Sequence, residues 1–109
     1  MDILFGDVKI ERLCSDEKWA KRQLGARSAK KLAARLADLR AALSWTEVLY
    51  GRPHQLKGDL AGCMALDLDG GMRLVLEAAD DPIPVDSLGN LDWRTVTIVR
   101  VVLIGDYHD

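Results

Sequence analysis

The last fifteen residues, Thr95 to Asp109 (TVTIVRVVLIGDYHD), constrain the fold more than any other segment. They contain an almost unbroken run of β-branched and aliphatic residues, which predicts a strand that is apolar on both faces. Such a strand usually lies inside a sheet. After Gly105 the chain carries four residues that can give, take or orient protons: Asp106, Tyr107, His108 and Asp109. Polar groups just past a buried strand are well placed for a functional site, although a solvated tail is the alternative.

The length of 109 residues predicts a single domain, residues 1–109, with one hydrophobic core. Hydrophobic residues make up 49% of the chain and charged residues 29%, as in soluble globular proteins. No apolar stretch approaches the roughly 20 residues that cross a bilayer. The N-terminus has early acids and lacks a basic segment followed by an apolar run, so we expect no secretory signal, no membrane partner and a cytoplasmic location.

Only two cysteines are present, Cys14 and Cys63, and neither belongs to a Cys-x-x-Cys or Cys/His cluster. A disulfide framework and a zinc site are therefore not expected, and both thiols are predicted to be small core residues. The sequence predicts no metal ligands and no cofactor.

Charge is distributed unequally along the chain. Residues 1–58 carry 12 Lys and Arg and 7 Asp and Glu, whereas residues 59–109 carry 3 and 10. This asymmetry indicates either a basic surface that meets a polyanion or acidic partner, or two halves that neutralise each other in the fold. The net charge of −2 makes strong nonspecific nucleic-acid binding by bulk charge a poor expectation.

The first half of the chain is predicted to be mainly helical after a short strand at Ile3–Phe5. Asp7 is a candidate N-cap, and Ser15 or Asp16 is expected to begin a second helical turn. The clearest helix spans Ser28 to Leu43, with Ser28 as its N-cap. Four leucines recur on one face of it and are predicted to pack on the sheet: Leu32, Leu36, Leu39 and Leu43.

Basic residues decorate these helical segments. They are predicted to contact RNA or an acidic partner, with an ordinary solvated helix face as the alternative. The candidates are Lys21, Arg22, Lys30, Lys31 and Arg35.

From residue 54 onwards the hydrophobic period changes to that of strands. Residues 63–69 and 72–77 flank Gly70-Gly71, which predicts a β-hairpin. Residues 80–93 hold Pro82, Pro84 and Gly89 and predict a long polar loop that could cover or reshape a site. The order of one strand, helices and then three strands predicts an α+β fold, with a mainly antiparallel sheet packed on the N-terminal helices.

Four segments together resemble the RelE/ParE toxin superfamily, and specifically its HigB-like plasmid-maintenance killer proteins. They are HQLKGD at 54–59, GCMALDLDGG at 62–71, MRLVLE at 72–77 and GDYHD at 105–109, and the likeness spans essentially the whole chain. The resemblance implies the compact RelE-like toxin fold and a ribosome-dependent endoribonuclease that cleaves mRNA. It also implies a cognate helix-turn-helix antitoxin, with operator DNA bound only through that antitoxin.

RNA cleavage without a metal needs a base for the 2′-OH, cations around the phosphorane and an acid for the leaving oxygen. The two histidines, His54 and His108, are the natural proton-transfer groups because histidine titrates near neutrality. Lys57 and Arg73 would supply the cations. Tyr107 could stack on a base or orient the ribose, and Asp106 could orient His108.

Each of these residues also has a structural alternative. Arg73, for example, could simply pair with Asp69 or Glu77 across the hairpin. The family often carries basic residues where this chain has Leu60-Ala61 and Asp67. Two rival functions therefore stay open: a catalytically weak or inactive toxin-fold module that acts through antitoxin and operator binding, and a ParE-like gyrase inhibitor.

Overall fold

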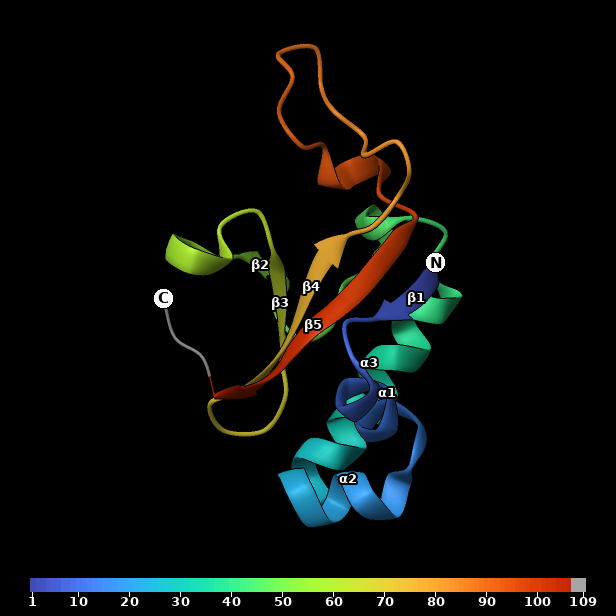
Figure 1. Cartoon of the computed structure of the whole chain (residues 1–109), viewed down its shortest axis with the longest axis vertical. Coiled ribbons are helices and arrows are strands. Elements are labelled where there is room, and N and C mark those ends of the chain that lie inside the picture. The colour runs from blue at the N-terminus through green and yellow to red at the C-terminus, as the bar shows by residue number, and fades with distance from the viewer. Residues whose placement is uncertain (107–109) are drawn as a thin grey trace.

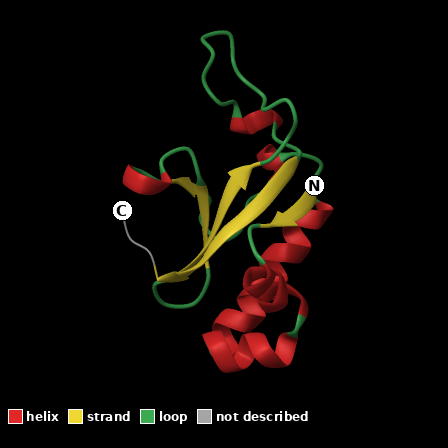
Figure 2. Cartoon of the chain, viewed as in Figure 1, coloured by secondary structure: helices red, strands yellow, loops and turns green. Residues whose placement is uncertain are grey.

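The computed structural model describes residues 1–106, in which three α-helices pack on a five-stranded mixed sheet (Figures 1 and 2). The helices are α1 (Val8–Ser15), α2 (Glu17–Leu24) and α3 (Ala26–Ala41), and the strands are β1 (Asp2–Phe5), β2 (His54–Gln55), β3 (Met64–Asp67), β4 (Met72–Ala78) and β5 (Ile98–Asp106). Three short 3-10 helices connect them: η1 (Trp45–Glu47), η2 (Gly58–Leu60) and η3 (Trp93–Thr95). The predicted α+β fold is confirmed.

β5 lies inside the sheet, as its apolar sequence predicts. The strand order is β1-β5-β4-β3-β2, and β5 pairs parallel with β1 and antiparallel with β4. Val99 and Val101 are completely buried, while Val102 and Leu103 are partly buried on the other face. The pairing shifts at Val75/Leu76, a bulge that changes the register towards the end of β5.

Two aspartates begin the first helices. The Asp7 Oδ1 atom accepts a hydrogen bond from the backbone N–H of Ile10 at 2.7 Å. Asp16, rather than Ser15, begins α2, because its Oδ1 atom accepts from the N–H of Trp19 at 3.0 Å. Each carboxylate satisfies a backbone donor that the first turn of a helix leaves unpaired.

The predicted bounds of the longest helix are wrong at both ends. Gly25, at φ 85°, ends α2 and begins α3 without a side-chain cap, so α3 starts before Ser28. Ser28 is consequently buried inside the helix instead of capping it. Leu43 lies beyond the end of α3 and is 79% exposed, so the leucine stripe has three buried members and not four.

The main core lies between α3 and one face of the sheet. Leu32, Leu36 and Leu39 are at most 2% exposed and belong to the same cluster as the buried residues of β3, β4 and β5. Trp45 and Trp93 close this cluster, with ring centroids 4.9 Å apart. Packing of the helix on the sheet therefore follows the predicted leucine face.

A smaller cluster covers part of the second face of the sheet. Leu56, Ala65 and Val75 are buried there, with Leu60 and Cys63 packed against them. The short strand β2 is not predicted by the sequence, and it pairs antiparallel with β3 through His54 and Ala65. This pairing brings the segment before residue 58 onto the edge of the sheet.

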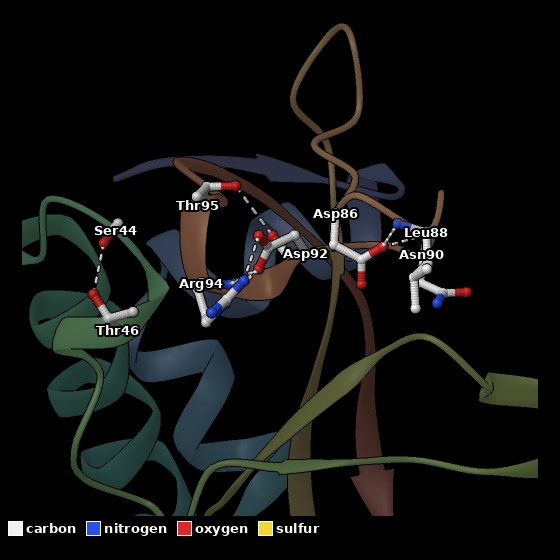
Figure 3. Close-up of polar contacts among 8 residues, drawn as sticks. All are labelled: Ser44, Thr46, Asp86, Leu88, Asn90, Asp92, Arg94 and Thr95. Carbon is white, nitrogen blue, oxygen red and sulfur yellow. Dashed lines mark hydrogen bonds and ion pairs between the residues drawn. The ribbon is translucent and has the colours of Figure 1, made fainter.

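The segment between β4 and β5 is a long loop, as predicted, and has polar contacts of its own. The Asp86 side chain accepts from the N–H groups of Leu88 and Asn90, at 2.8 and 3.0 Å (Figure 3). Near the loop's end, hydrogen bonds from the Arg94 guanidinium hold the pKa of Asp92 below its usual range. The loop follows the last residue of β4, whereas Arg73 lies near the start of that strand, and Figure 1 shows the loop extending beyond the sheet.

Candidate functional site

The strand register gathers the predicted site residues of the hairpin on the second face of the sheet. Asp67 on β3 lies opposite Arg73 on β4, and Arg73 lies opposite Gly105 on β5. His54 on β2 lies opposite Ala65, two residues before Asp67 on the same strand. Because residues two apart on a strand share a face, His54, Asp67 and Arg73 belong to one surface.

Arg73 pairs with a residue that the sequence does not single out as its partner. The Nε atom of Arg73 is 3.6 Å from Oδ1 of Asp67, and the Arg73 side chain is only 13% exposed. The alternatives named from the sequence face other cations: Asp69 lies 3.4 Å from Lys31, and Glu77 lies 2.6 Å from Arg100. Asp67 is a directly opposite neighbour of Arg73, whereas Glu77 lies opposite Arg100.

Arg52 is a site residue that the sequence analysis missed. Its Nε atom lies 2.7 Å from Oδ2 of Asp67, and its Nη2 atom lies 3.3 Å from Oδ1. The Asp67 carboxylate thus forms ion pairs with two guanidinium groups, those of Arg52 and Arg73. Arg52 lies between Gly51 and Pro53, a pattern that indicates only a break in the chain. It reaches the site because β2 pairs with β3, and β2 leaves no clear pattern in the sequence.

A hydrogen bond to the backbone orients the His54 ring and sets the tautomer of its neutral form. Its Nδ1 atom lies 2.8 Å from the carbonyl oxygen of Arg52. A carbonyl can only accept, so Nδ1 carries the proton and the neutral ring has its lone pair on Nε2. Nε2 is buried and has no hydrogen-bond partner within residues 1–106. The lone pair of the neutral ring thus belongs to a buried atom on the second face of the sheet.

The remaining predicted catalytic residues are spread more widely. Lys57 is exposed and directly precedes η2. Asp106, at the end of β5, lies opposite Met72, and its carboxylate lies over Gly71, where a Cβ atom would come within 2.6 Å of Oδ1. Tyr107 and His108 lie outside the described residues, so the predicted role of Asp106 in orienting His108 stays a prediction.

The basic residues of the helices lie in different places. Lys21 and Lys30 line a groove of about 530 Å³ between the three helices, together with Arg40. Arg22 is exposed on α2. Lys31 and Arg35 face the hairpin instead: Lys31 pairs with Asp69, and Arg35 donates from Nε to the Asp67 carbonyl at 3.4 Å. The predicted basic surface is thus not one continuous patch.

The helical groove also contains a thiol of low reactivity. Burial raises the pKa of Cys14 to about 11, although the nearby Arg40 opposes this shift. Burial likewise raises the pKa of Cys63. Because thiolates are the reactive form, neither cysteine has the character of a nucleophile.

Two further findings delimit the chemistry of residues 1–106. In this range no cluster of three or more His, Cys, Asp or Glu side chains is arranged to hold a metal ion. No helix in the same range is long and apolar enough to cross a membrane. The second face of the sheet carries Arg52, Arg73 and His54, and guanidinium groups such as these can bind an anion.

Comparison with known proteins finds solved structures with a similar fold. No protein-family model and no curated protein matches the sequence. Among solved structures, a YoeB/ParE toxin from Agrobacterium tumefaciens is 16% identical with a TM-score of 0.59, and the match covers 99% of this chain and 100% of that one.

Two structures from Staphylococcus aureus are also similar. A YoeB dimer is 22% identical with a TM-score of 0.56, and a YoeB–YefM complex is 21% identical with a TM-score of 0.53. Both matches cover 100% of this chain and 98% of the other. Over its whole length, therefore, the chain shares the α+β fold of these toxin structures.

Proposed function

We propose that the chain is the toxin of a type II toxin–antitoxin module and that it cleaves mRNA on the ribosome. The observation that carries the proposal is the hydrogen bond from His54 to the Arg52 carbonyl, which leaves the lone pair on Nε2 of a histidine that shares a sheet face with Arg73. The likeness to YoeB/ParE toxins supports the toxin assignment. The HigB-like motifs of the sequence support the nuclease activity.

The reaction is an internal transfer of the phosphodiester. His54 takes the proton of the 2′-OH through Nε2, and the 2′-oxygen attacks phosphorus. Arg73 and Lys57 stabilise the negative charge of the phosphorane. The bond to the 5′-oxygen breaks, and an acid, which we assign to His108, protonates the leaving group. The products are a 2′,3′-cyclic phosphate and a 5′-hydroxyl. We assign Tyr107 a separate role, in which its ring stacks on a base of the RNA.

An antitoxin and the ribosome are the partners that this function requires. The similar YoeB–YefM structure is a complex of two proteins, which supports a protein partner for this chain. We assign that partner as a helix-turn-helix antitoxin, and operator DNA is bound only through it. The basic residues of α2 and α3 are available to the antitoxin or to ribosomal RNA.

A catalytically weak or inactive toxin-fold module is the second candidate. The observation in its favour is the pairing of Asp67 with both Arg52 and Arg73, because a carboxylate at this place opposes phosphate binding. Such a module acts through its antitoxin and the operator. A gyrase inhibitor of the ParE type is a third candidate, and it would need no proton-transfer groups.

The deciding experiment is to induce the protein alone in a bacterium and map new mRNA 5′ ends. We expect growth arrest with cuts in translated frames, and loss of the cuts in His54→Ala and His108→Ala. Arg94→Gln is the matched control, since Arg94 is exposed and pairs with Asp92 in the loop. Arrest without cuts would direct attention to gyrase and call for a supercoiling assay. A wild-type protein that is harmless at high expression would contradict the toxin assignment.

A further inference from the structure

We propose that Arg52 and Arg73 form a binding site for a backbone phosphodiester of RNA, and that Asp67 is the internal counter-ion which the phosphate displaces. The inference rests on the proposed function, because that function makes RNA the source of the phosphate. It adds Arg52 to the site and gives Asp67 a role as counter-ion.

The geometry of the three side chains supports a single shared site. Asp67 presents Oδ1 to Nε of Arg73 at 3.6 Å and Oδ2 to Nε of Arg52 at 2.7 Å. The second nitrogen of Arg52 also reaches Oδ1 at 3.3 Å, which makes this contact two-pronged. Guanidinium groups bind phosphate oxygens with the same fork that they offer to a carboxylate. The Asp67 carboxylate thus occupies the place that a phosphate would take.

The Arg52 backbone is held in an uncommon conformation. Arg52 has φ 51° and follows Gly51 at φ 83°, so both residues are in the left-handed region. Few non-glycine residues adopt it, and those that do cluster at functional sites. Gly51 also has no room for a side chain, because a Cβ atom would lie 2.6 Å from Nε of Arg35.

Two hydrogen bonds connect this segment to the rest of the site. The Gly51 carbonyl accepts from the N–H of Asp67 at 2.6 Å, and the Arg52 carbonyl accepts from Nδ1 of His54 at 2.8 Å. The backbone that places Arg52 beside Asp67 is therefore the same backbone that orients the proposed base. A phosphate bound between the arginines would lie near His54.

The exposure of the three groups makes the exchange feasible. The side chains of Arg52 and Asp67 are 62% and 31% exposed, and Arg73 is 13% exposed. The Arg52–Asp67 pair is the more exposed of the two, and because exposed ion pairs contribute little to stability, an incoming phosphate can replace the carboxylate at Arg52 at small cost. Asp67 would then remain nearby as a like charge that lowers affinity for RNA.

Removal of the Asp67 charge is the direct test. Asp67→Asn keeps the shape of the side chain, and we expect it to bind a single-stranded RNA about three- to tenfold more tightly at low salt. Arg52→Gln should bind about three- to tenfold more weakly and reduce the slope of log affinity against log salt by about one. The matched controls are Asp69→Asn, on the same hairpin but paired with Lys31, and Arg94→Gln.

The measurement is fluorescence anisotropy with a labelled 2′-O-methyl oligoribonucleotide, which carries phosphates but cannot be cleaved. Thermal unfolding followed by circular dichroism shows whether each variant is folded. If Asp67→Asn is unfolded, Arg52→Gln tests the proposal instead, because Arg52 is exposed. Asp67→Asn binding no more tightly than Asp69→Asn, or Arg52→Gln binding like Arg94→Gln, would overturn the inference. Because the probe reports binding alone, a failure of mRNA cleavage in cells is a separate result.

Discussion

Asp67 determines how much positive charge the second face of the sheet offers to a ligand. In the family that the sequence resembles, a basic residue is common at the position of Asp67. In the structure the carboxylate contacts Arg52 and Arg73 and so organises these cations as well as opposing an anion. The Asp67 side chain therefore has two opposite effects on anion binding, because it orients the two arginines and also repels the anion. The tertiary contacts decide which effect is larger.

Asp80 provides a pH-dependent prediction at the scale of one residue. Partial burial raises its pKa, but hydrogen bonds from Thr97 Oγ1 and from the backbone N–H groups of Thr97 and Ile98 outweigh this effect and lower the pKa. A lowered folded-state pKa contributes stability that is present above the unfolded pKa of about 3.9 and is lost as the pH falls through the folded pKa. Asp80→Ala should therefore cost about 1 kcal/mol at pH 7 and less at pH 3.

Urea unfolding of the wild type and of Asp80→Ala at the two pH values measures this difference. Asp81→Ala is a neighbouring control, because Asp81 is exposed at the start of the same loop. An equal loss of unfolding free energy at pH 7 and pH 3 would show that the Asp80 charge is not responsible.

The helix boundaries show what local sequence can and cannot specify at the scale of an element. Asp7 is correctly predicted as a cap, and Asp16 is one of the two residues predicted to begin the second helix, because a polar side chain before an apolar period is a local signal. Ser28 has the same chemistry but is buried inside α3, because Gly25 turns the chain three residues earlier. A glycine can end one helix and begin the next without a side-chain cap, and this possibility competes with any nearby serine.

The cap at Asp7 gives a prediction for α1. Asp7→Ala should lower the free energy of unfolding by about 1 kcal/mol, since the N–H of Ile10 loses its side-chain acceptor. The measurement is chemical denaturation, with Lys9→Ala, an exposed residue in the first turn of the same helix, as control. A loss as large for Lys9→Ala would refute the capping role.

Strand β2 explains why the candidate site could be predicted only in part. His54, Lys57 and Arg73 are recognisable because they belong to motifs in the sequence. Arg52 is not, because its place depends on the pairing of β2 with β3 and on two successive left-handed residues. The partner of Arg73 likewise depends on the strand register, which fixes Asp67 and not Asp69 as its neighbour.

The molecule consists of a packed body and a projecting loop, and one leucine substitution in each should distinguish their contributions to stability. Leu39 is completely buried between α3 and the sheet, whereas Leu88 in the loop is 84% exposed. We expect Leu39→Ala to lower the free energy of unfolding by about 2 to 5 kcal/mol and Leu88→Ala to change it by less than about 0.5 kcal/mol. Denaturant titration checks both, and a comparable loss for Leu88→Ala would mean that the loop contributes to the folded core.

The parallel pairing of β1 with β5 has a consequence for how the protein is made. Asp2 pairs with Ile98, so nearly all of the described chain must leave the ribosome before the first strand finds its neighbour. Pairing between residues so distant in sequence slows folding, because a large loop must close first. The nascent chain therefore keeps an unpaired strand edge until β5 has been made and has left the ribosome. For a protein whose proposed target is the translating ribosome, this delay means that the complete sheet forms only after β5 has emerged from the ribosome that makes it.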